Sequence, residues 1–336
     1  MQRTLIRLVA ALGLLAATAT ATAQDIQERV IKFGHLNNPD HPTSLGVKKF
    51  AELVAAKSGG KIKVNEFPSS QLGNELQQQS ALVGGVQEML VASTTSLAGI
   101  VRECGLLDLP FLFANARQAD AMVDGPLGKA LTAKLADKGI VVLGFFDLGF
   151  RNVTNSKRPI MKGADLEGLK LRVIPNPVFL ETFKTFKANP VPMPFAELYG
   201  ALESKAVDGQ ENPYAVILSS KLYEVNKYVS ETNHVYATNP VQVSKRFWEK
   251  LSPAEQKLLQ EAAAEAQAYQ RTVSREVSGK AVAELKAKGM VHNEIAPAEK
   301  ARLRAEVRAV HDKFTAAYDP AVVTLFKAEL ERVSKL

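Results

Sequence analysis

The longest periodic segment of the chain, residues 252–287, constrains the fold most, because it predicts one helix of about 35 residues. Ser252-Pro253-Ala254-Glu255 is a helix start, with serine at the N-cap, proline at the first helical position and glutamate three residues after the cap. Apolar residues then recur at helical spacing, with Gly279 as the one interruption. At about 1.5 Å per residue this helix is roughly 50 Å long, which exceeds one lobe, so it is expected to run across two.

The segments before this helix alternate between strand and helix signals, the rhythm of an α/β fold. Residues 29–36 and 61–67 alternate as strands do, and residues 44–57 between them have helical spacing. Asn74 caps a predicted helix that Gly84-Gly85 terminates. Further along, the sequence predicts helices over 119–138, 177–187 and 195–204, and strands over 140–146, 169–174 and 190–193. At 336 residues the chain is longer than one core usually serves, so two lobes are expected.

The N-terminal residues predict an export signal. Arg3 and Arg7 form a basic region, and residues 8–17 form an apolar core too short to span a membrane. Ala21-Thr22-Ala23 is a cleavage motif that predicts a mature chain from about Gln24, with Ala17-Thr18-Ala19 as a second site and a retained anchor as the alternative. Cleavage lowers the net charge from +7 to +5, because the segment holds two arginines and no acids. This mild, dispersed excess argues against a nucleic-acid partner and fits attraction of anionic small molecules.

Signatures of catalysis and metal binding are scarce in this sequence. It has no G-x-S-x-G, H-E-x-x-H, C-x-x-C or glycine-rich phosphate loop. The single Cys104 rules out an internal disulfide, and no cysteine follows the signal to carry a lipid anchor. The five histidines are scattered, whereas a zinc site needs three or four converging ligands. The sequence therefore predicts no catalytic residue, no metal site and no cofactor.

Two arginines lie at predicted strand exits. Leu169, Leu171 and Val173 share one face of a strand, so Arg172 points to the other face near the strand end. Arg151 follows the buried run 140–146 and Gly149, so it also lies at the exit of a predicted strand. Ligands of open α/β sheets bind at the carboxyl ends of strands, and a guanidinium fork matches a carboxylate with two parallel hydrogen bonds. For either arginine, a structural ion pair with a neighbouring acid is the alternative.

Five further residues complete the predicted ligand-binding set. Asn212 follows a tight turn, where its side chain either caps a helix or offers a donor and an acceptor to a ligand. Phe195 follows a strand end and is either core or a ring over the ligand. Glu75 opens a helix, where the dipole alone favours a carboxylate. Ser93 begins a polar turn, and His35 lies in the first predicted strand, one residue before its end, although a structural or rim role is the alternative for this histidine.

Taken together, these segments resemble the DctP family, the periplasmic substrate-binding subunits of TRAP transporters, over nearly the whole mature chain. The matching blocks follow the family's order. They are Phe67-Pro-Ser-Ser-Gln-Leu-Gly73, Leu109-Pro-Phe-Leu-Phe113, Arg151 with Thr154-Asn-Ser-Lys-Arg-Pro-Ile160, Asp165-Leu-Glu-Gly-Leu-Lys-Leu-Arg-Val173, Pro192-Met-Pro-Phe195 with Glu197, Val207-Asp-Gly-Gln-Glu-Asn-Pro213, Tyr223-Glu-Val-Asn-Lys-Tyr228 and Thr232-Asn-His234.

The resemblance implies an α/β, two-lobe periplasmic binding protein of the type II-like kind, with mixed sheets, hinge strands and a long helix spanning both lobes. After a signal peptide over 1–23, lobe I is expected to comprise 24–149 plus about 238–277, and lobe II 150–237 plus about 278–336. The chain is then expected in the periplasm, cleaved near Ala23, as a monomer that passes a small organic acid to the TRAP membrane permease. An exported enzyme acting on a carboxylate and a ligand-presenting sensor module are the alternatives.

The resemblance also implies roles for single residues. Arg172 is the family's carboxylate clamp, Arg151 a second carboxylate contact and Asn212 a polar ligand contact, while Phe195 packs on the ligand and Glu75 contacts its polar groups. The chain departs from sialic-acid-binding relatives, which carry a glutamate near the position of Ala92 or Ser93. The departure predicts a smaller or less polar ligand, and four-carbon dicarboxylates, 2-oxo acids and aromatic acids remain open.

Overall fold

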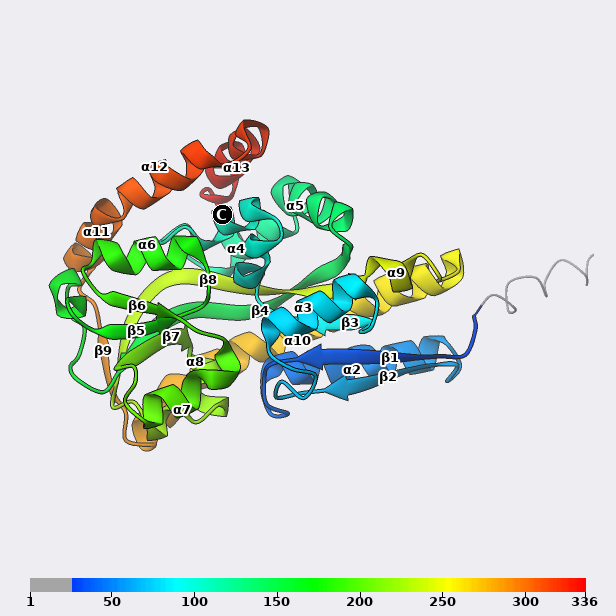
Figure 1. Cartoon of the computed structure of the whole chain (residues 1–336), viewed down its shortest axis with the longest axis horizontal. Coiled ribbons are helices and arrows are strands. Elements are labelled where there is room, and N and C mark those ends of the chain that lie inside the picture. The colour runs from blue at the N-terminus through cyan, green and yellow to red at the C-terminus, as the bar shows by residue number, and fades with distance from the viewer. Residues whose placement is uncertain (1–25) are drawn as a thin grey trace, which may run out of the picture.

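The computed structural model describes residues 26–336, so the predicted export signal and both cleavage motifs lie outside the described residues. Within them, the strands form one mixed sheet. The strands are β1 (Arg29–His35), β2 (Ile62–Phe67), β3 (Met89–Val91), β4 (Ile140–Asn155), β5 (Lys170–Val173), β6 (Asn189–Pro192), β7 (Gly209–Pro213), β8 (Tyr228–Ser244) and β9 (Val291–Glu294). Their order is β2-β1-β3-β8-β4-β7-β5-β6, and β9 pairs with β8 (Figure 1).

Helices cover both faces of this sheet (Figure 1). The α-helices are α2 (Pro42–Lys57), α3 (Glu75–Gly84), α4 (Ala116–Val123), α5 (Pro126–Asp137), α6 (Pro177–Thr185), α7 (Leu198–Glu203), α8 (Tyr214–Ser219), α9 (Lys245–Trp248), α10 (Pro253–Ala287), α11 (Pro297–Glu306), α12 (Arg308–Ala317) and α13 (Pro320–Val333). Short 3₁₀ helices are η1 (Thr94–Gly99), η2 (Arg102–Asp108), η3 (Gly163–Leu166), η4 (Phe195–Glu197) and η5 (Leu222–Glu224).

Two long antiparallel strands, β4 and β8, join the halves of the molecule. The first part of β4 pairs with the end of β8, which also pairs with β3. The last part of β4, Arg151–Asn155, pairs with β7 and with the start of β8. One half of the molecule therefore carries β1–β3 with α2 and α3, and the other carries β5–β7 with α6–α8. This arrangement, with mixed parallel and antiparallel pairing, confirms the predicted two-lobe α/β fold and its connecting strands.

The long helix α10 has the bounds that the sequence predicts, because its start is encoded locally. The Ser252 hydroxyl accepts from the Glu255 amide, and the Glu255 carboxylate accepts from the Ser252 amide. Near its start, Leu259 packs in one core with Phe50 of α2. Near its end, Leu285 packs in another core with Ile217 of α8. The helix thus contacts both halves of the molecule, as expected from its length.

Two predicted elements end elsewhere than expected. The helix predicted over 119–138 is two helices, α4 and α5, because Gly125 and Pro126 begin a new helix between them. The strand predicted over 140–146 continues to Asn155. It does so through register shifts, one of them at Leu148 between Asp147 and Gly149, where the Gly149 φ is 105°.

The C-terminal helices α11–α13 run from one half of the molecule back to the other (Figure 1). Lys313 of α12 lies 2.8 Å from Glu181 of α6, and Lys134 of α5 lies 3.0 Å from Asp319, the N-cap of α13. The last helix, α13, lies against α4 and α5. The lobe boundaries, with about 278–336 in lobe II, stay a prediction.

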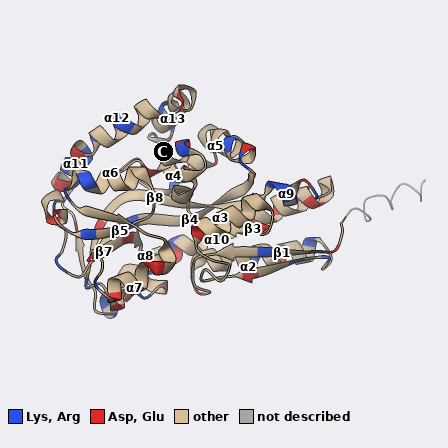
Figure 2. Ribbon diagram, in the orientation of Figure 1, with Lys and Arg blue, Asp and Glu red and all other residues tan. Residues whose placement is uncertain are grey.

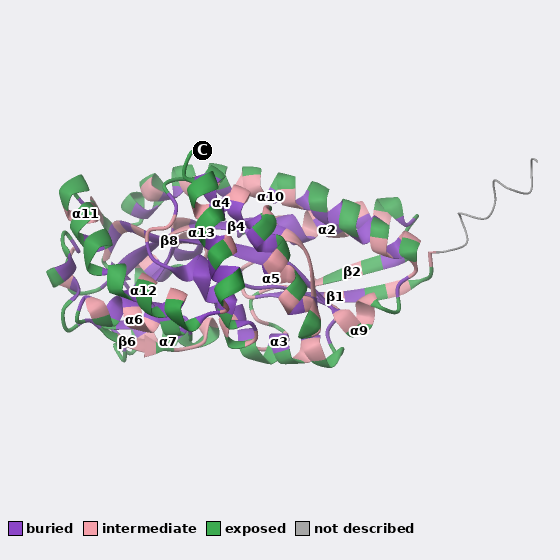
Figure 3. Ribbon diagram, turned by 90° about the horizontal axis from the view of Figure 1, so that it is seen from above, coloured by how far each residue is buried: buried purple, intermediate pink, exposed green. Residues whose placement is uncertain are grey.

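The core lies between the sheet and its covering helices, while charged side chains are spread over the outer surfaces (Figures 2 and 3). Basic and acidic residues are both spread over the elements of the molecule, as the dispersed charge in the sequence predicts (Figure 2). Cys104 is buried, and burial raises the pKa of its thiol. Among residues 26–336, no helix combines the length and the hydropathy that a membrane crossing requires.

Candidate functional site

A cavity lies where the two halves of the molecule meet. Six of the seven predicted ligand-binding residues line it, and His35 does not. Its lining residues come from β4 and from both halves of the fold. They are Leu36, Asn37, Glu75, Val91, Ala92, Ser93, Leu148, Arg151, Arg172, Ile174, Phe195, Asn212, Val216 and Asn239.

Arg172 lines this cavity, and one of its three guanidinium nitrogens is hydrogen-bonded within the protein. It lies on β5, where Leu171 and Val173 pack into the hydrophobic core and direct the arginine to the opposite face. Its Nε donates to the Met193 carbonyl at 2.9 Å, while Nη1 and Nη2 are buried and have no hydrogen-bond partner in the protein. Burial lowers the pKa of Arg172 to about 10, so the side chain stays charged at neutral pH. Two adjacent donors are therefore available for an anion.

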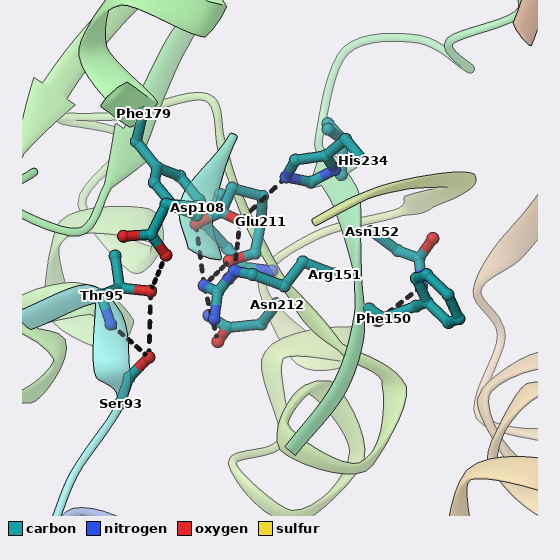
Figure 4. Close-up of polar contacts among 12 residues, drawn as sticks. Ser93, Thr95, Asp108, Phe150, Arg151, Asn152, Phe179, Glu211, Asn212 and His234 are labelled. Carbon is teal, nitrogen blue, oxygen red and sulfur yellow. Dashed lines mark hydrogen bonds and ion pairs between the residues drawn. The ribbon is translucent and has the colours of Figure 1, made fainter. Parts of the chain in front are cut away.

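Arg151 is held by a buried ion pair with Glu211, which lies on the neighbouring strand β7 (Figure 4). Its Nη2 lies 2.8 Å from Glu211 Oε1, and His234 Nε2 lies 3.0 Å from Glu211 Oε2. Burial alone would raise the pKa of Glu211, but Arg151 and His234 hold it below its usual range. The structural ion pair that was the alternative for both arginines is present at Arg151. Only its Nη1 has no partner.

Glu75 enters the cavity from the first turn of α3. Asn74 caps this helix by accepting from the Gln77 amide, and Gly85 ends it with a φ of 79°, as the sequence predicts. The side chain of Glu75 is buried, and its Oε1 has no hydrogen-bond partner in the protein. Burial raises the pKa of Glu75, and a hydrogen bond with Ser96 and the nearby positive charges of Arg172 and Arg151 oppose this rise.

Three further predicted residues line the cavity, and each already makes a contact within the protein. They are Asn212, Ser93 and Phe195. Asn212 Oδ1 accepts from Arg151 Nη2 at 3.1 Å, so this amide supports the arginine rather than capping a helix (Figure 4). The Ser93 hydroxyl caps η1 by accepting from the Thr95 amide and donates to the Thr95 hydroxyl. The Phe195 ring lies 5.9 Å from the guanidinium carbon of Arg172, within cation–π range.

His35 lies outside the cavity, so the structure does not support its predicted ligand contact. The side chain is fully buried at the end of β1, and its Nε2 lies 2.9 Å from Glu66 Oε1. Glu66 is on the paired strand β2 and also accepts from the Ser44 hydroxyl. The pairing of β1 with β2 therefore directs His35 to this internal cluster, and the following residues, Leu36 and Asn37, line the cavity instead.

Sequence reasoning missed several lining residues. Asn37 follows the end of β1. Ligands commonly bind at the ends of strands, so its position in the sequence could have predicted it as a lining residue. Asn239 lies in the middle of β8, where no local feature marks it. Leu148 is the extra residue of the β4 bulge, which only the strand pairing reveals.

A polar network links the two halves beside the cavity. Asn176, the N-cap of α6, donates to Asp108 Oδ2 and to the Thr95 carbonyl, both at 2.9 Å. The Thr95 hydroxyl donates to Asp108 Oδ1 at 2.7 Å (Figure 4). Burial raises the pKa of Asp108 to about 7, although these hydrogen bonds and Arg151 oppose the rise.

The site has the chemistry of anion recognition. Two buried guanidinium groups face the cavity, one neutralised by Glu211 and one with two unpartnered nitrogens. Within residues 26–336, no group of three or more His, Cys, Asp or Glu side chains converges as metal ligands do. A cavity between two α/β halves with this lining defines a solute-binding protein.

The comparisons with known proteins identify the family. This chain belongs to the DctP family, bacterial extracellular solute-binding protein family 7, whose model matches residues 33–317. The members are substrate-binding subunits of TRAP transporters, which confirms the predicted family and a binding protein rather than an enzyme. Family members are periplasmic.

Individual relatives agree with this assignment. The chain is 37% identical to the 2,3-diketo-L-gulonate-binding periplasmic protein YiaO of Escherichia coli, over 82% of this chain and 84% of that one. It is 32% identical to the C4-dicarboxylate-binding periplasmic protein DctP of Rhodobacter capsulatus, over 94% of both. The sugar acid binding protein DctPAm of Advenella mimigardefordensis, solved with galactonate, is 40% identical with a TM-score of 0.90, covering 92% of this chain and 100% of that one.

Proposed function

We propose that this protein binds a small organic acid in the cavity, holds the carboxylate with Arg172 and delivers the acid to a TRAP membrane permease. The observation that carries the proposal is the pair of buried Arg172 nitrogens without a partner in the protein. Two parallel N–H donors fit the two oxygens of a carboxylate, and binding them satisfies both buried donors. Nη1 of Arg151 is a third donor to the same cavity.

The energetics fit a transport protein. A charge-assisted hydrogen bond contributes about 1.5–3 kcal/mol, and micromolar binding requires about 8 kcal/mol. One bidentate clamp with a few polar and apolar contacts therefore suffices. Solved relatives support an acid as the ligand, since their structures contain galactonate, D-erythronate and succinate, each with at least one carboxylate.

Closure of the two halves is part of the proposed function. Arg172 and Glu75, from opposite halves, are 1% and 5% exposed, so an acid reaches them only when the halves separate. An acid that contacts both halves favours the closed arrangement, because differential affinity shifts the equilibrium. The connecting strands β4 and β8 and the helix α10 are the elements about which the halves rotate.

The cellular setting of the proposal follows from the family. Its members are periplasmic binding subunits, so we place the mature chain in the periplasm, cleaved near Ala23 and acting as a monomer that docks on the permease in its closed form. Uptake of the bound acid in cells with and without a TRAP permease tests delivery. It also separates transport from the sensor role, in which uptake is independent of the permease.

The clamp is tested by thermal shift against a panel of small organic acids. An acid at 100 times its dissociation constant stabilises the folded protein by about 2.7 kcal/mol, so a true ligand raises the melting temperature clearly. Arg172→Ala is expected to abolish the shift at the same concentration. Arg304→Ala, at an exposed position of α11, is the matched control and retains the shift. An unchanged shift in Arg172→Ala excludes Arg172 as the clamp.

A further inference from the structure

A second pocket, here called the rear pocket, lies beside the strands that connect the two halves. Among the described residues, it shares no lining residue with the ligand cavity. Its walls come mainly from β4, β8, the start of α8 and the middle of α10, and they include Gly149, Tyr214, Tyr236 and Ser278. The rear pocket is therefore built on the connecting elements about which the halves rotate in the proposed function.

The rear pocket and the ligand cavity lie on opposite faces of β4. Leu148 lines the ligand cavity, whereas its neighbours Asp147 and Gly149 line the rear pocket. Figure 4 shows the same division, with Arg151 of the ligand cavity and Phe150 of the rear pocket on opposite sides of the strand. Successive side chains of a strand point to opposite faces, so β4 forms the partition between the two spaces.

Each side of the rear pocket is fastened to a different half. On one side, Arg275 of α10 pairs with Asp120 of α4 at 2.6 Å, and both residues belong to the predicted lobe I. On the other side, the Tyr214 hydroxyl of α8 lies 3.2 Å from His292 Nε2 of β9, and both residues belong to the predicted lobe II. When the halves rotate, these two walls therefore move relative to each other.

Little space separates β4 from α10 at the β4 bulge. Gln270 exchanges two hydrogen bonds with the backbone of Asp147, at 2.7 and 2.8 Å, which fasten the helix to the strand. A Cβ at Gly149 would lie 3.9 Å from Ser278 Oγ, an ordinary van der Waals distance. Because the partition lies between the two spaces, a rotation that widens the ligand cavity brings the walls of the rear pocket together. Packed atoms resist overlap, so a group in the rear pocket obstructs this rotation.

On this basis, and resting on the proposed function, we infer that the rear pocket controls the equilibrium between the open and closed forms, and that filling it holds the halves closed. The acid binds the closed form, and the apparent dissociation constant rises as the closed fraction falls. A closed form populated at about 0.1–10% without acid leaves room for affinity to increase about 10- to 1,000-fold. A group that fills the rear pocket therefore tightens acid binding without touching the acid.

The first test fills the rear pocket and measures binding by isothermal titration calorimetry of the acid that gives the largest thermal shift. Ser278→Trp, from α10, is expected to lower the dissociation constant at least about threefold, because it raises the closed fraction. Ala116→Phe fills the pocket from α4 and should act in the same direction. Ala264→Trp, at an exposed position of α10 outside the pocket, is the control and should leave the dissociation constant unchanged. Melting temperatures show whether each variant is folded.

A second test reads the width of the rear pocket and needs no bulky side chain. Ser278→Cys places a thiol in the pocket wall, and the wild type, whose Cys104 is buried, gives the background rate. Reaction with N-ethylmaleimide is expected to be at least about twofold faster with a saturating acid than without it, because the closed form has the wider rear pocket. Ala264→Cys should react equally fast under both conditions.

The inference and the proposed function fail in different ways. If the folded filling variants bind the acid with the affinity of the wild type, or if the acid does not accelerate the reaction of Ser278→Cys, the inference is wrong and the Arg172 clamp stands. If no acid binds the wild type, the proposed function fails. Small-angle X-ray scattering without acid then decides the inference: Ser278→Trp is expected to have a smaller radius of gyration than the wild type, and an equal radius overturns it.

Discussion

At the scale of single residues, Asp108 is the carboxyl group whose burial has the clearest consequence. It accepts hydrogen bonds from Thr95 in one half of the molecule and Asn176 in the other, and it is 1% exposed. Its pKa of about 7 means that the folded protein keeps this proton to a higher pH than the unfolded chain, which loses it near pH 4.

This shift predicts how the stability depends on pH. The contribution of Asp108 to the free energy of unfolding is fully present below about pH 4 and is lost as the pH rises through about 7. Asp108→Asn removes this titration. The stability of the wild type relative to this variant is therefore expected to fall by up to about 4 kcal/mol between pH 4 and pH 8.

Urea denaturation at several pH values measures the difference. Asp312→Asn, the same substitution at an exposed position of α12, is the matched control. A difference between wild type and Asp108→Asn that is constant over this range contradicts the assignment.

The two arginines show what a sequence reveals about single side chains. Alternation along a strand was enough to predict that Arg172 leaves the core face, and the structure places it in the cavity. The same local argument applied to Arg151 and could not distinguish ligand contact from ion pair. Its partner Glu211 lies 60 residues away in sequence, and only the pairing of β4 with β7 brings them together. The contact of His35 with Glu66 was not predictable for the same reason, because it depends on the pairing of β1 with β2.

At the scale of elements, helix ends that depend on local caps were predictable from the sequence, and the ends of long strands were not. The bounds of α10 and α3 follow from Ser252, Asn74 and Gly85, whose caps act within a few residues. The break between α4 and α5 was signalled by Gly125-Pro126 and overlooked. By contrast, β4 continues past residue 146 because β8 and β7 pair with it. Its bulges interrupt the alternation of side chains, so the sequence pattern does not reveal the full length of the strand.

Two glycines on connecting elements give opposite predictions for the same substitution. Gly149 in β4 has a φ of 105°, so Gly149→Ala is expected to destabilise the protein by about 1–2 kcal/mol through backbone strain. Gly279 in α10 is exposed, and a Cβ there would meet nothing within 4 Å. Gly279→Ala is expected to stabilise the protein by about 0.5–1 kcal/mol, since alanine favours a helix interior.

Urea denaturation of both variants and of the wild type measures whether each substitution raises or lowers the free energy of unfolding. A stabilising Gly149→Ala would mean that the bulge does not impose its backbone conformation. A destabilising Gly279→Ala would mean that α10 needs local flexibility at this point.

At the scale of the whole molecule, the buried position of the cavity predicts a change of shape on binding. The fold holds its ligand-facing residues between two halves joined by β4, β8 and α10, so the protein without an acid is expected to populate a more open arrangement. Addition of a saturating acid that binds in the thermal-shift panel should lower the radius of gyration measured by small-angle X-ray scattering.

Arg172→Ala provides the comparison, because it removes the clamp and should leave the radius of gyration unchanged by the acid. A wild-type radius that does not respond to a bound acid would show that binding occurs without rotation of the halves.

The burial of Cys104 makes it practical to measure this motion in single molecules by fluorescence. Its thiol is shielded from solvent and has a raised pKa, so it reacts poorly with maleimide dyes, and it is the single cysteine of the sequence. Two cysteines introduced on the outer surfaces, one on each half, can therefore carry a fluorescent donor and acceptor with little background labelling. Energy transfer between the dyes would then report, in real time, how long each capture of cargo lasts.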